Sequence, residues 1–325
     1  MQPVLFDTDL GVDDALAIAM ALNAPELDVI GLTAVAGNVS IEQGTRSALQ
    51  LLELLGRDDV PVYVGAKKPL FIDRVDAVQV HGSTGLGYAE LPEPSTLPVG
   101  RAVDHIIGEI QKCPGELIVV AIGPLTNLAL AERKSPGILN RARRVVAMGG
   151  ALWCGGNITD TSEYNIYADP HALSELLQAL TNLTLIPLDV TEQLTLTEGE
   201  IVAACQARGD RWTRFVQEAT QSVFEFEQAQ GGARKMHLHN PSVHALLIEP
   251  SLFSMRALAI GVETEGASAG SLRVLPEESE EGMFVDCAVD VGSARHGVSA
   301  RQSIGFVMFY YMCFKYTTRE KGSSD

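Results

Sequence analysis

Residues 4–24 read VLFDTDLGVDDALAIAMALNA and combine a short apolar run, an acidic cluster and a periodic apolar stretch. The run Val4-Leu5-Phe6 has the composition of a buried strand, and from residue 13 to residue 24 apolar side chains recur at helical spacing. The stretch therefore predicts a strand that leads directly into a helix. Four aspartates lie at this junction, namely Asp7, Asp9, Asp13 and Asp14.

The same alternation continues outward along the chain. Short β-branched runs predict strands at 29–35, 61–64, 117–122, 144–148 and 183–187, and apolar periodicity predicts helices at 41–55, 102–111, 127–133 and 170–180. Residues 66–98 are rich in Gly, Pro and Ser and predict a long loop of the kind that is usually functional. This order predicts an α/β fold with a doubly wound, mostly parallel central sheet, formed by a single domain over residues 1–325.

In doubly wound sheets, ligands bind outside the carboxyl ends of the strands. Polar residues follow the predicted strands at this position, namely Asp7, Asp9, Asn38, Thr126 and Asn157. We therefore expect the active site at the carboxyl ends of the strands.

The four aspartates are too close together to remain ordinary carboxylates. Groups crowded in this way either have a raised pKa or hold a cation. Because no His or Cys lies among them, their oxygen ligands favour calcium or magnesium over zinc. The alternative is that Asp13 caps the helix and the other three are solvated, but a cap explains only one of the four acids.

The composition narrows the class of protein. A formal net charge of −17 repels nucleic acid and anionic membranes, which favours a small-molecule or metal-dependent role. Five scattered cysteines without a CxxC pair argue against a disulfide framework or a zinc site and favour a reducing compartment. The acidic run Glu277, Glu278, Glu280 and Glu281 is expected to be a solvated loop.

The N-terminus has no basic and apolar signal segment. The longest late apolar run, 304–314, is shorter than the ~20 residues that span a bilayer, and it predicts a buried C-terminal helix. We therefore expect a cytoplasmic protein without membrane contact.

The stretch DTDLGVDDA at 7–15 resembles the N-terminal signature of the nucleoside hydrolase family. Further segments are similar to the motifs of this family and follow in the same order, namely VAGN at 35–38, HGSTG at 81–85, GPLTN at 123–127, MGG at 148–150, GN at 156–157, EYN at 163–165 with DP at 169–170, and HNP at 239–241. The resemblance covers residues 4–241 and points to the calcium-dependent hydrolases of the inosine/uridine-preferring type. The opening Asp7-Thr8-Asp9 is also similar to haloacid-dehalogenase-type phosphatases, but the pair Asp13-Asp14 does not fit their mechanism.

The resemblance implies hydrolysis of the N-glycosidic bond of a ribonucleoside to ribose and a free base, as in purine or pyrimidine salvage. It also implies a homodimer or homotetramer whose partner is a small-molecule ribonucleoside. The transition state of this reaction resembles an oxocarbenium ion with a poor leaving group, so the site must stabilise positive charge on the sugar and activate both water and base.

Roles for individual residues follow from the same resemblance. Asp9 would bind Ca²⁺ and take the proton from the attacking water, while His239 would donate to the leaving base. The other calcium ligands would be Asp14, the backbone carbonyl of Thr126, and Asn240. The substrate contacts would be Asp13, Asn38, His81, Asn157, Glu163 and Asn165. Asp7 would contact the metal ligands without binding the metal itself.

The chain departs from the family pattern at Asn240, where an aspartate is usual. A neutral amide oxygen can bind calcium, but it removes one negative charge, so calcium affinity should fall. Two readings stay open: a working enzyme with weaker calcium binding or altered substrate choice, and a nucleoside-binding homologue with little turnover. The sequence does not name the base, whose recognition we expect to lie in loops around 70–90 and 220–237.

Overall fold

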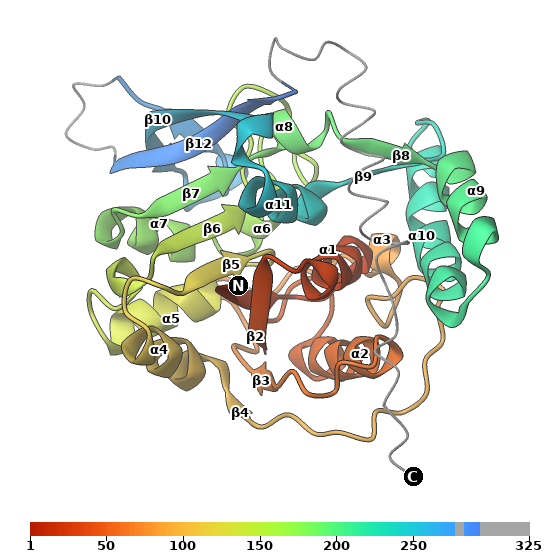
Figure 1. Ribbon diagram of the computed structural model, residues 1–325. Helices are drawn as coiled ribbons and strands as arrows, with labels where there is room; N and C mark the ends of the chain where they lie inside the picture. Colours follow the sequence, from red (N-terminus) through yellow and green to blue (C-terminus); the bar gives the residue numbers. More distant parts are fainter. Residues whose placement is uncertain (277–282, 293–325) are drawn as a thin grey trace.

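A ten-stranded sheet forms the centre of the computed structural model, which describes residues 1–276 and 283–292 (Figure 1). The strands of this sheet are β1 (Gln2–Thr8), β2 (Leu27–Ala34), β3 (Val62–Val64), β4 (Gly100–Arg101), β5 (Ile118–Ala121), β6 (Arg144–Met148), β7 (Leu183–Ile186), β10 (Phe253–Val262), β11 (Leu272–Val274) and β12 (Met283–Val291). Their order is β11-β10-β12-β7-β6-β5-β1-β2-β3-β4. All neighbouring strands from β12 to β4 are parallel, and β10 runs antiparallel to both β11 and β12.

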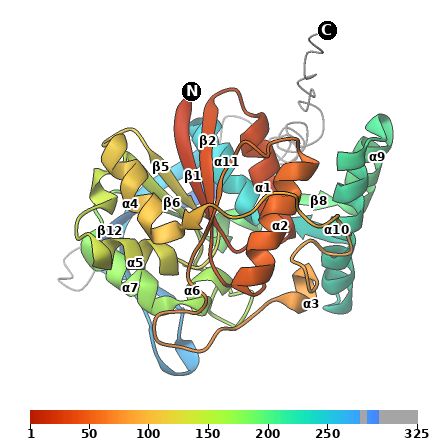
Figure 2. The same cartoon turned by 90° about the horizontal axis from the view of Figure 1, so that it is seen from below.

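Helices cover both faces of the sheet (Figures 1 and 2). The helices are α1 (Val12–Asn23), α2 (Ile41–Leu54), α3 (Val78–His81), α4 (Ala102–Lys112), α5 (Thr126–Lys134), α6 (Tyr164–Ala168), α7 (Pro170–Ala179), α8 (Leu188–Thr191), α9 (Glu198–Arg208), α10 (Arg211–Ala229) and α11 (His239–Ile248). Side chains of α1, α2, α8, α10 and α11 belong to one apolar cluster, and those of α4, α5 and α7 belong to a second. A separate antiparallel pair, β8 (Thr195–Thr197) and β9 (Lys235–His237), lies beside α9 and α10.

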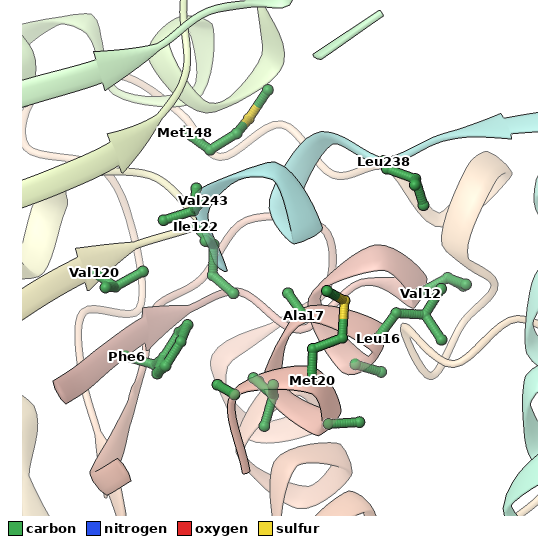
Figure 3. Packing of buried hydrophobic residues seen from close by; sticks show 14 of the residues in the cluster. Phe6, Val12, Leu16, Ala17, Met20, Val120, Ile122, Met148, Leu238 and Val243 are labelled. Atoms are coloured by element: carbon green, nitrogen blue, oxygen red, sulfur yellow. The ribbon is translucent and has the colours of Figure 1, made fainter. Parts of the chain in front are cut away.

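The central strands carry apolar side chains on both faces, because helices cover both faces of the sheet. In β1, Val4 and Phe6 enter the first cluster while Leu5 enters the second, as the period of two along a strand requires. Figure 3 shows the first cluster where Phe6 and Val120 of the sheet meet Leu16 of α1 and Val243 of α11. This packing fixes α1 and α11 against the same part of the sheet.

The winding direction of the chain changes at β1, which lies between β2 and β5. The connections from β1 lead to β2, β3 and β4 on one side, and the chain then returns to β5 on the other. Such a switch point opens a crevice at the carboxyl ends of the strands. The predicted α/β fold with a doubly wound, mostly parallel sheet is therefore confirmed.

The predicted elements up to residue 187 agree with the structure to within a few residues at each end, and 66–98 contains only the short α3 and a bend-rich chain before β4. No helix in 1–276 or 283–292 is both long and apolar enough to cross a membrane. Cys113, Cys154, Cys205 and Cys287 form no disulfide with one another. The acidic run at 277–281, the apolar run at 304–314 and Cys313 lie outside the described residues, so the single domain over 1–325 stays a prediction.

Candidate active site

The acidic cluster lies on the tight turn between β1 and α1. Leu10, in the middle of this turn, has a positive φ of 36°, a backbone conformation that is strained for a residue with a side chain. Two bonds to Asp14 hold the turn: the Thr8 hydroxyl donates to Oδ1 at 2.6 Å, and the Gly11 N–H donates to Oδ2 at 2.9 Å. Asp14 is thereby turned back toward the end of β1, beside Asp9.

Asp9 is fully buried, and its two oxygens differ in their partners. Its Oδ2 accepts the backbone N–H of Asn38 at 2.8 Å, whereas Oδ1 has no hydrogen-bond partner. Glycine backbone packs directly on both sides of this carboxylate. A Cβ at Gly37 would lie 2.1 Å from Oδ2, and a Cβ at Gly123 would lie 2.8 Å from Oδ1. Only glycine fits at these two positions without a shift of the chain.

The first turn of α11 closes the cluster from the opposite side. Asn240 donates its backbone N–H to Asp13 Oδ2 at 3.3 Å and its side-chain amide to Asp14 Oδ2 at 2.9 Å. The amide oxygen of Asn240 is buried and has no partner. The carboxylates thus lie between the N-termini of α1 and α11, where helix dipoles favour negative charge.

Burial and mutual repulsion make these carboxyl groups weak acids in the absence of a cation. Burial, and then the neighbouring Asp14, raises the pKa of Asp9 well above its usual range. Burial, and then Asp13, raises the pKa of Asp14 to about 8. Burial also raises the pKa of Asp13. A bound cation would favour the charged form of each group and oppose these shifts.

The oxygens of the cluster suit a hard cation. Two buried oxygens, Asp9 Oδ1 and Asn240 Oδ1, lack partners although buried polar atoms are nearly always paired. The described chain contains no group of three or more His, Cys, Asp or Glu side chains arranged for a metal. A cation here would therefore be held by two carboxylates, an amide oxygen and backbone carbonyls, a ligand set that fits calcium better than zinc.

The position of Thr126 does not favour its predicted role as the backbone ligand. Thr126 is the first residue of α5, so its carbonyl belongs to the hydrogen-bond ladder of that helix, and its hydroxyl donates to Asp169 at 2.7 Å. Ile122, directly after β5, lines the pocket instead. The next residue, Gly123, packs on Asp9, and the Ile122 carbonyl accepts the Asn165 amide at 3.4 Å.

A pocket extends from the acidic cluster toward α10 and β9. At its acidic end it is lined by the polar residues Asp13, Asn38, Asn157, Glu163, Asn165 and Asn240, together with Ile122, Met148 and Tyr164. Its other end is lined by Ala77, Gln79, Val80, His81, Ile158, Val223, Phe226, Glu227, Met236, His237 and His239. Residues of the segments 70–90 and 220–237 line the pocket, but 220–229 belongs to the helix α10 and not to the loop that the sequence predicts.

Glu163 and Asn165 line the pocket and also form hydrogen bonds with the surrounding backbone. Glu163 is the N-cap of α6 and accepts the backbone N–H groups of Gly150, Asn165 and Ile166 at 2.8–3.1 Å. Burial raises its pKa to about 7. The Asn165 amide donates to the carbonyls of Met148 at 3.2 Å and Ile122 at 3.4 Å. These contacts fix the side chains that face the cavity.

Two histidines face the pocket with their Nδ1 atoms turned away to protein partners. His81 Nδ1 accepts the backbone N–H of Val12 at 3.1 Å, and His239 Nδ1 lies 2.8 Å from the Thr191 hydroxyl. Burial lowers the pKa of His81, and it lowers the pKa of His239 to about 3. Burial thus favours the neutral form of both rings, and the catalytic role of His239 stays a prediction.

Asp7 lies behind the cluster. Its Oδ1 accepts from the Thr33 hydroxyl at 2.5 Å and from the Asn127 amide at 2.7 Å, while burial raises its pKa to about 7. The same amide also donates to the Ala34 carbonyl. Asp7 thus joins β1, β2 and α5 and does not line the pocket.

Comparison with known proteins identifies the family of the chain. The family of inosine-uridine preferring nucleoside hydrolases matches residues 4–296. The chain belongs to this family. Among its relatives, the pyrimidine-specific ribonucleoside hydrolase RihA of Citrobacter koseri is 38% identical, with 84% of this chain and 88% of the relative covered. Uridine nucleosidase 1 of Arabidopsis thaliana is 35% identical, with 83% of this chain and 80% of the relative covered.

Solved nucleoside hydrolases share the fold of the chain. The plant enzyme PpNRh1 superposes with a TM-score of 0.87 at 29% identity and covers 96% of this chain and 99% of its own. A purine-preferring ribonucleoside hydrolase from Gardnerella vaginalis has the same TM-score at 31% identity and the same coverage. As a nucleoside hydrolase, the chain is an N-glycosidase that hydrolyses ribonucleosides, and neither the phosphatase nor the inactive homologue is favoured.

Several pocket residues of this nucleoside hydrolase could not be found from the sequence motifs. Ile122 lines the pocket although its residue type gives no sign of a functional position. The apolar lining of Met148, Phe226 and Met236 looks like ordinary core sequence. Glu227 follows an amphipathic pattern on α10, and that pattern is the signal that could have predicted this helix.

Proposed function

We propose that this nucleoside hydrolase acts on pyrimidine ribonucleosides of the uridine type and uses calcium. The observation that carries the proposal is the pair of unpartnered buried oxygens, Asp9 Oδ1 and Asn240 Oδ1, beside a pocket that is lined from α1, α3, α6, α10, α11, β6 and β9. The names of the relatives in Citrobacter koseri and Arabidopsis thaliana support the pyrimidine preference.

The calcium would be held by Asp9, Asp14, the Asn240 amide oxygen and the Ile122 carbonyl. When bound, it would supply positive charge that keeps the carboxylates ionised and binds hydroxyl groups of the sugar. Asp9 then accepts the proton of the attacking water at its free oxygen. The Asn38 N–H on its other oxygen keeps this carboxylate in position.

The sugar is positioned by the polar residues of the acidic end. Asp13 accepts a hydrogen bond from a ribose hydroxyl, because its carboxylate lines the pocket and has only a long contact of 3.3 Å to the Asn240 N–H. Asn157, Glu163 and Asn165 bind the opposite end of the sugar. Their carboxylate, amide and carbonyl dipoles favour the positive charge that develops on the ring in the transition state.

The base lies at the histidine end. As the N-glycosidic bond breaks, the base collects negative charge, and neutral His81 and His239 stabilise it by donating hydrogen bonds from Nε2. Neither ring needs to be an imidazolium for this role. Gln79 and Glu227 are the polar side chains near which the edge of the base would lie.

The proposal is tested with a panel of ribonucleosides, 2′-deoxyribonucleosides and 5′-nucleotides in the presence of calcium. Release of reducing sugar measures glycosidase activity, and release of inorganic phosphate measures phosphatase activity. We expect uridine and cytidine to give free base and ribose faster than inosine, with the deoxyribonucleosides much slower. Faster turnover of inosine would overturn the pyrimidine preference, and phosphate release without reducing sugar would overturn the activity itself.

A homodimer or homotetramer in the cytoplasm, as the family resemblance implies, belongs to the same proposal. Light scattering on the purified full chain would give the mass of the assembly, to be divided by the chain mass of 34.8 kDa. A mass of two or four chains supports the assembly, and a mass of one chain contradicts it.

A further inference from the structure

The Thr191 hydroxyl contacts the His239 ring at Nδ1, the nitrogen that is turned away from the pocket. Thr191 is the last residue of α8 and is fully buried, and its hydroxyl oxygen lies 2.8 Å from His239 Nδ1. The other ring nitrogen, Nε2, is thereby left for the pocket that His239 lines. A hydroxyl can either donate or accept, so the partner of Nδ1 decides which nitrogen of the neutral ring carries the proton.

The second pocket histidine shows which arrangement the site favours. His81 Nδ1 faces the backbone N–H of Val12 at 3.1 Å, and a peptide N–H can only donate. Neutral His81 must therefore carry its proton on Nε2. If the Thr191 hydroxyl donates to Nδ1 of His239, both rings present an Nε2–H group to the base.

The surroundings of α8 restrict the movement of His239. The Leu238 N–H, directly before His239, donates to the Leu194 carbonyl at 2.8 Å and ties this backbone to the segment after α8. His237 stacks on His239 with ring centroids 5.5 Å apart and 15° between planes, and its Nδ1 lies 3.1 Å from the Glu192 carbonyl. The position of the His239 imidazole is thus restricted by the backbone bond of Leu238, by the stacked ring of His237 and by the contact of Nδ1 with Thr191.

The start of α8 is fixed in turn. Asp189 accepts the backbone N–H groups of Leu152, Trp153 and Cys154 at 2.8–3.1 Å. This anchor binds α8 to the loop after β6, which continues to the sugar-binding residue Asn157. The residue that contacts His239 therefore lies on an element that is held to the scaffold of the sugar site.

We propose that Thr191 is a positioning residue of the glycosidase reaction, whose hydroxyl donates to His239 Nδ1 and so holds the neutral imidazole as the Nε2–H donor to the leaving base. This inference rests on the proposed function for the identity of the leaving group. The hydrogen bond from Nε2 stabilises the electron pair that moves onto the base when the C1′–N bond breaks. The imidazole keeps its proton, and the departing base takes one from solvent.

The test uses Thr191→Val, which removes the hydroxyl and keeps the shape, and Thr191→Ser, which restores a hydroxyl. Histidine ¹⁵N chemical shifts, with His239 assigned from a His239→Asn sample, report the tautomer directly. We expect a pyridine-like Nδ1 and a protonated Nε2 in the natural protein and in Thr191→Ser. In Thr191→Val we expect a mixture of both tautomers.

Kinetics supply a second readout, because 4-nitrophenyl β-D-ribofuranoside has a leaving group that needs no hydrogen bond. In Thr191→Val, kcat for uridine should fall on the order of 10²-fold, while kcat for the nitrophenyl riboside should stay within roughly 2-fold. Thr191→Ser should recover most of the uridine activity. The matched control is Thr45→Val on α2, where a buried hydroxyl donates to the Ile41 carbonyl away from the pocket, and both substrates should be unaffected.

Each other outcome overturns the inference or the proposed function separately. A protonated Nδ1 on His239 in the natural protein, or an equal loss of kcat on both substrates in Thr191→Val, contradicts the role of Thr191. Unchanged tautomer and uridine turnover in Thr191→Val contradict it as well. If the natural protein cleaves neither substrate, the proposed function fails, and the ¹⁵N shifts still decide whether Thr191 sets the tautomer.

Discussion

At the scale of single residues, the proposed reaction depends on the two carboxylate oxygens of Asp9. One is bound by the Asn38 N–H at 2.8 Å, and the other is buried without a hydrogen-bond partner. This asymmetry lets one oxygen orient the group while the other accepts a proton.

Replacement of Asp9 by asparagine tests this division. Asp9→Asn keeps an oxygen for the Asn38 N–H but removes the proton acceptor and one negative charge. We expect kcat for uridine to fall about 10³-fold, within the usual range for loss of a general base. Asp58→Asn, at an exposed position, is the charge-matched control and should retain full activity. Near-normal turnover in Asp9→Asn would contradict the role of Asp9.

Replacing Asn240 by aspartate should raise calcium affinity but lower the stability of the metal-free protein. Asn240→Asp would place a negative charge where an amide now donates to Asp14 at 2.9 Å. We expect calcium affinity, measured by calorimetry, to rise about tenfold because the number of charged ligands increases. In the metal-free protein the added repulsion should lower the melting temperature.

The exposed substitution Gln111→Glu adds the same charge on α4 and should change neither quantity. An Asn240→Asp protein with unchanged calcium affinity would show that this position does not limit metal binding. A rise in turnover together with affinity would show that Asn240 also limits the natural activity.

The sequence predicted side chains of the site better than its backbone. The acidic cluster was evident because four carboxylates in eight residues have no ordinary structural explanation. The proposed backbone ligand Ile122 was not evident, since any residue type can offer a carbonyl, and its place is visible only from the packing of the next residue, Gly123, against Asp9. The partner of His239 was also invisible, because Thr191 is distant along the chain and belongs to no motif.

At the scale of elements, α6 depends on the carboxylate that caps it. Glu163 accepts three backbone N–H groups, and an amide at this position can accept with only one of its two terminal atoms. We expect Glu163→Gln to lower the free energy of unfolding by about 1–3 kcal/mol, since buried donors lose their acceptor. It should also raise KM for uridine, because the capped segment carries Asn165.

Chemical denaturation and steady-state kinetics check this pair of effects. The control is Glu200→Gln, which alters the exposed capping box of α9 and should cost less stability without a change in KM. A Glu163→Gln protein with unaltered stability would contradict the capping role. A loss of stability with unchanged KM would limit Glu163 to a structural role.

Before residue 187 the sequence predicted the longer elements, whose apolar patterns are regular, but not α3, β4 and α6. Later elements lack such patterns for different reasons. Helix α11 is buried from Asn240 to Leu246, so it has no polar face to reveal the helical period. In β10 the burial alternates irregularly around a shift in register between Ser254 and Met255, which obscures the period of two.

At the scale of the whole molecule, the buried carboxyl groups link stability to both pH and calcium. The pKa values of Asp7 and Glu163 are raised to about 7 and that of Asp14 to about 8. In the unfolded chain these groups ionise near pH 4. Their raised values favour the folded, protonated form, so this contribution to stability is complete below about pH 4 and is lost as pH rises through 7 to 8.

Calcium binding should reverse this loss. A ligand that binds only the folded chain stabilises it by about 2.7 kcal/mol at a concentration of 100 Kd. Because protons compete with calcium for the carboxylates, the gap between the melting temperatures with calcium and with a chelator should widen from pH 5 to pH 8. Differential scanning calorimetry at four pH values measures it. A gap that narrows with rising pH would contradict a metal bound by these carboxylates.

The central claim is that the acidic cluster holds one calcium ion that the glycosidase reaction requires. The most direct measurement is ribose release from uridine by chelator-treated protein during titration with calcium. We predict negligible release without metal, and recovery that saturates at one calcium ion per chain in the natural protein and fails in Asp9→Asn. Undiminished ribose release by the metal-free protein would contradict the account.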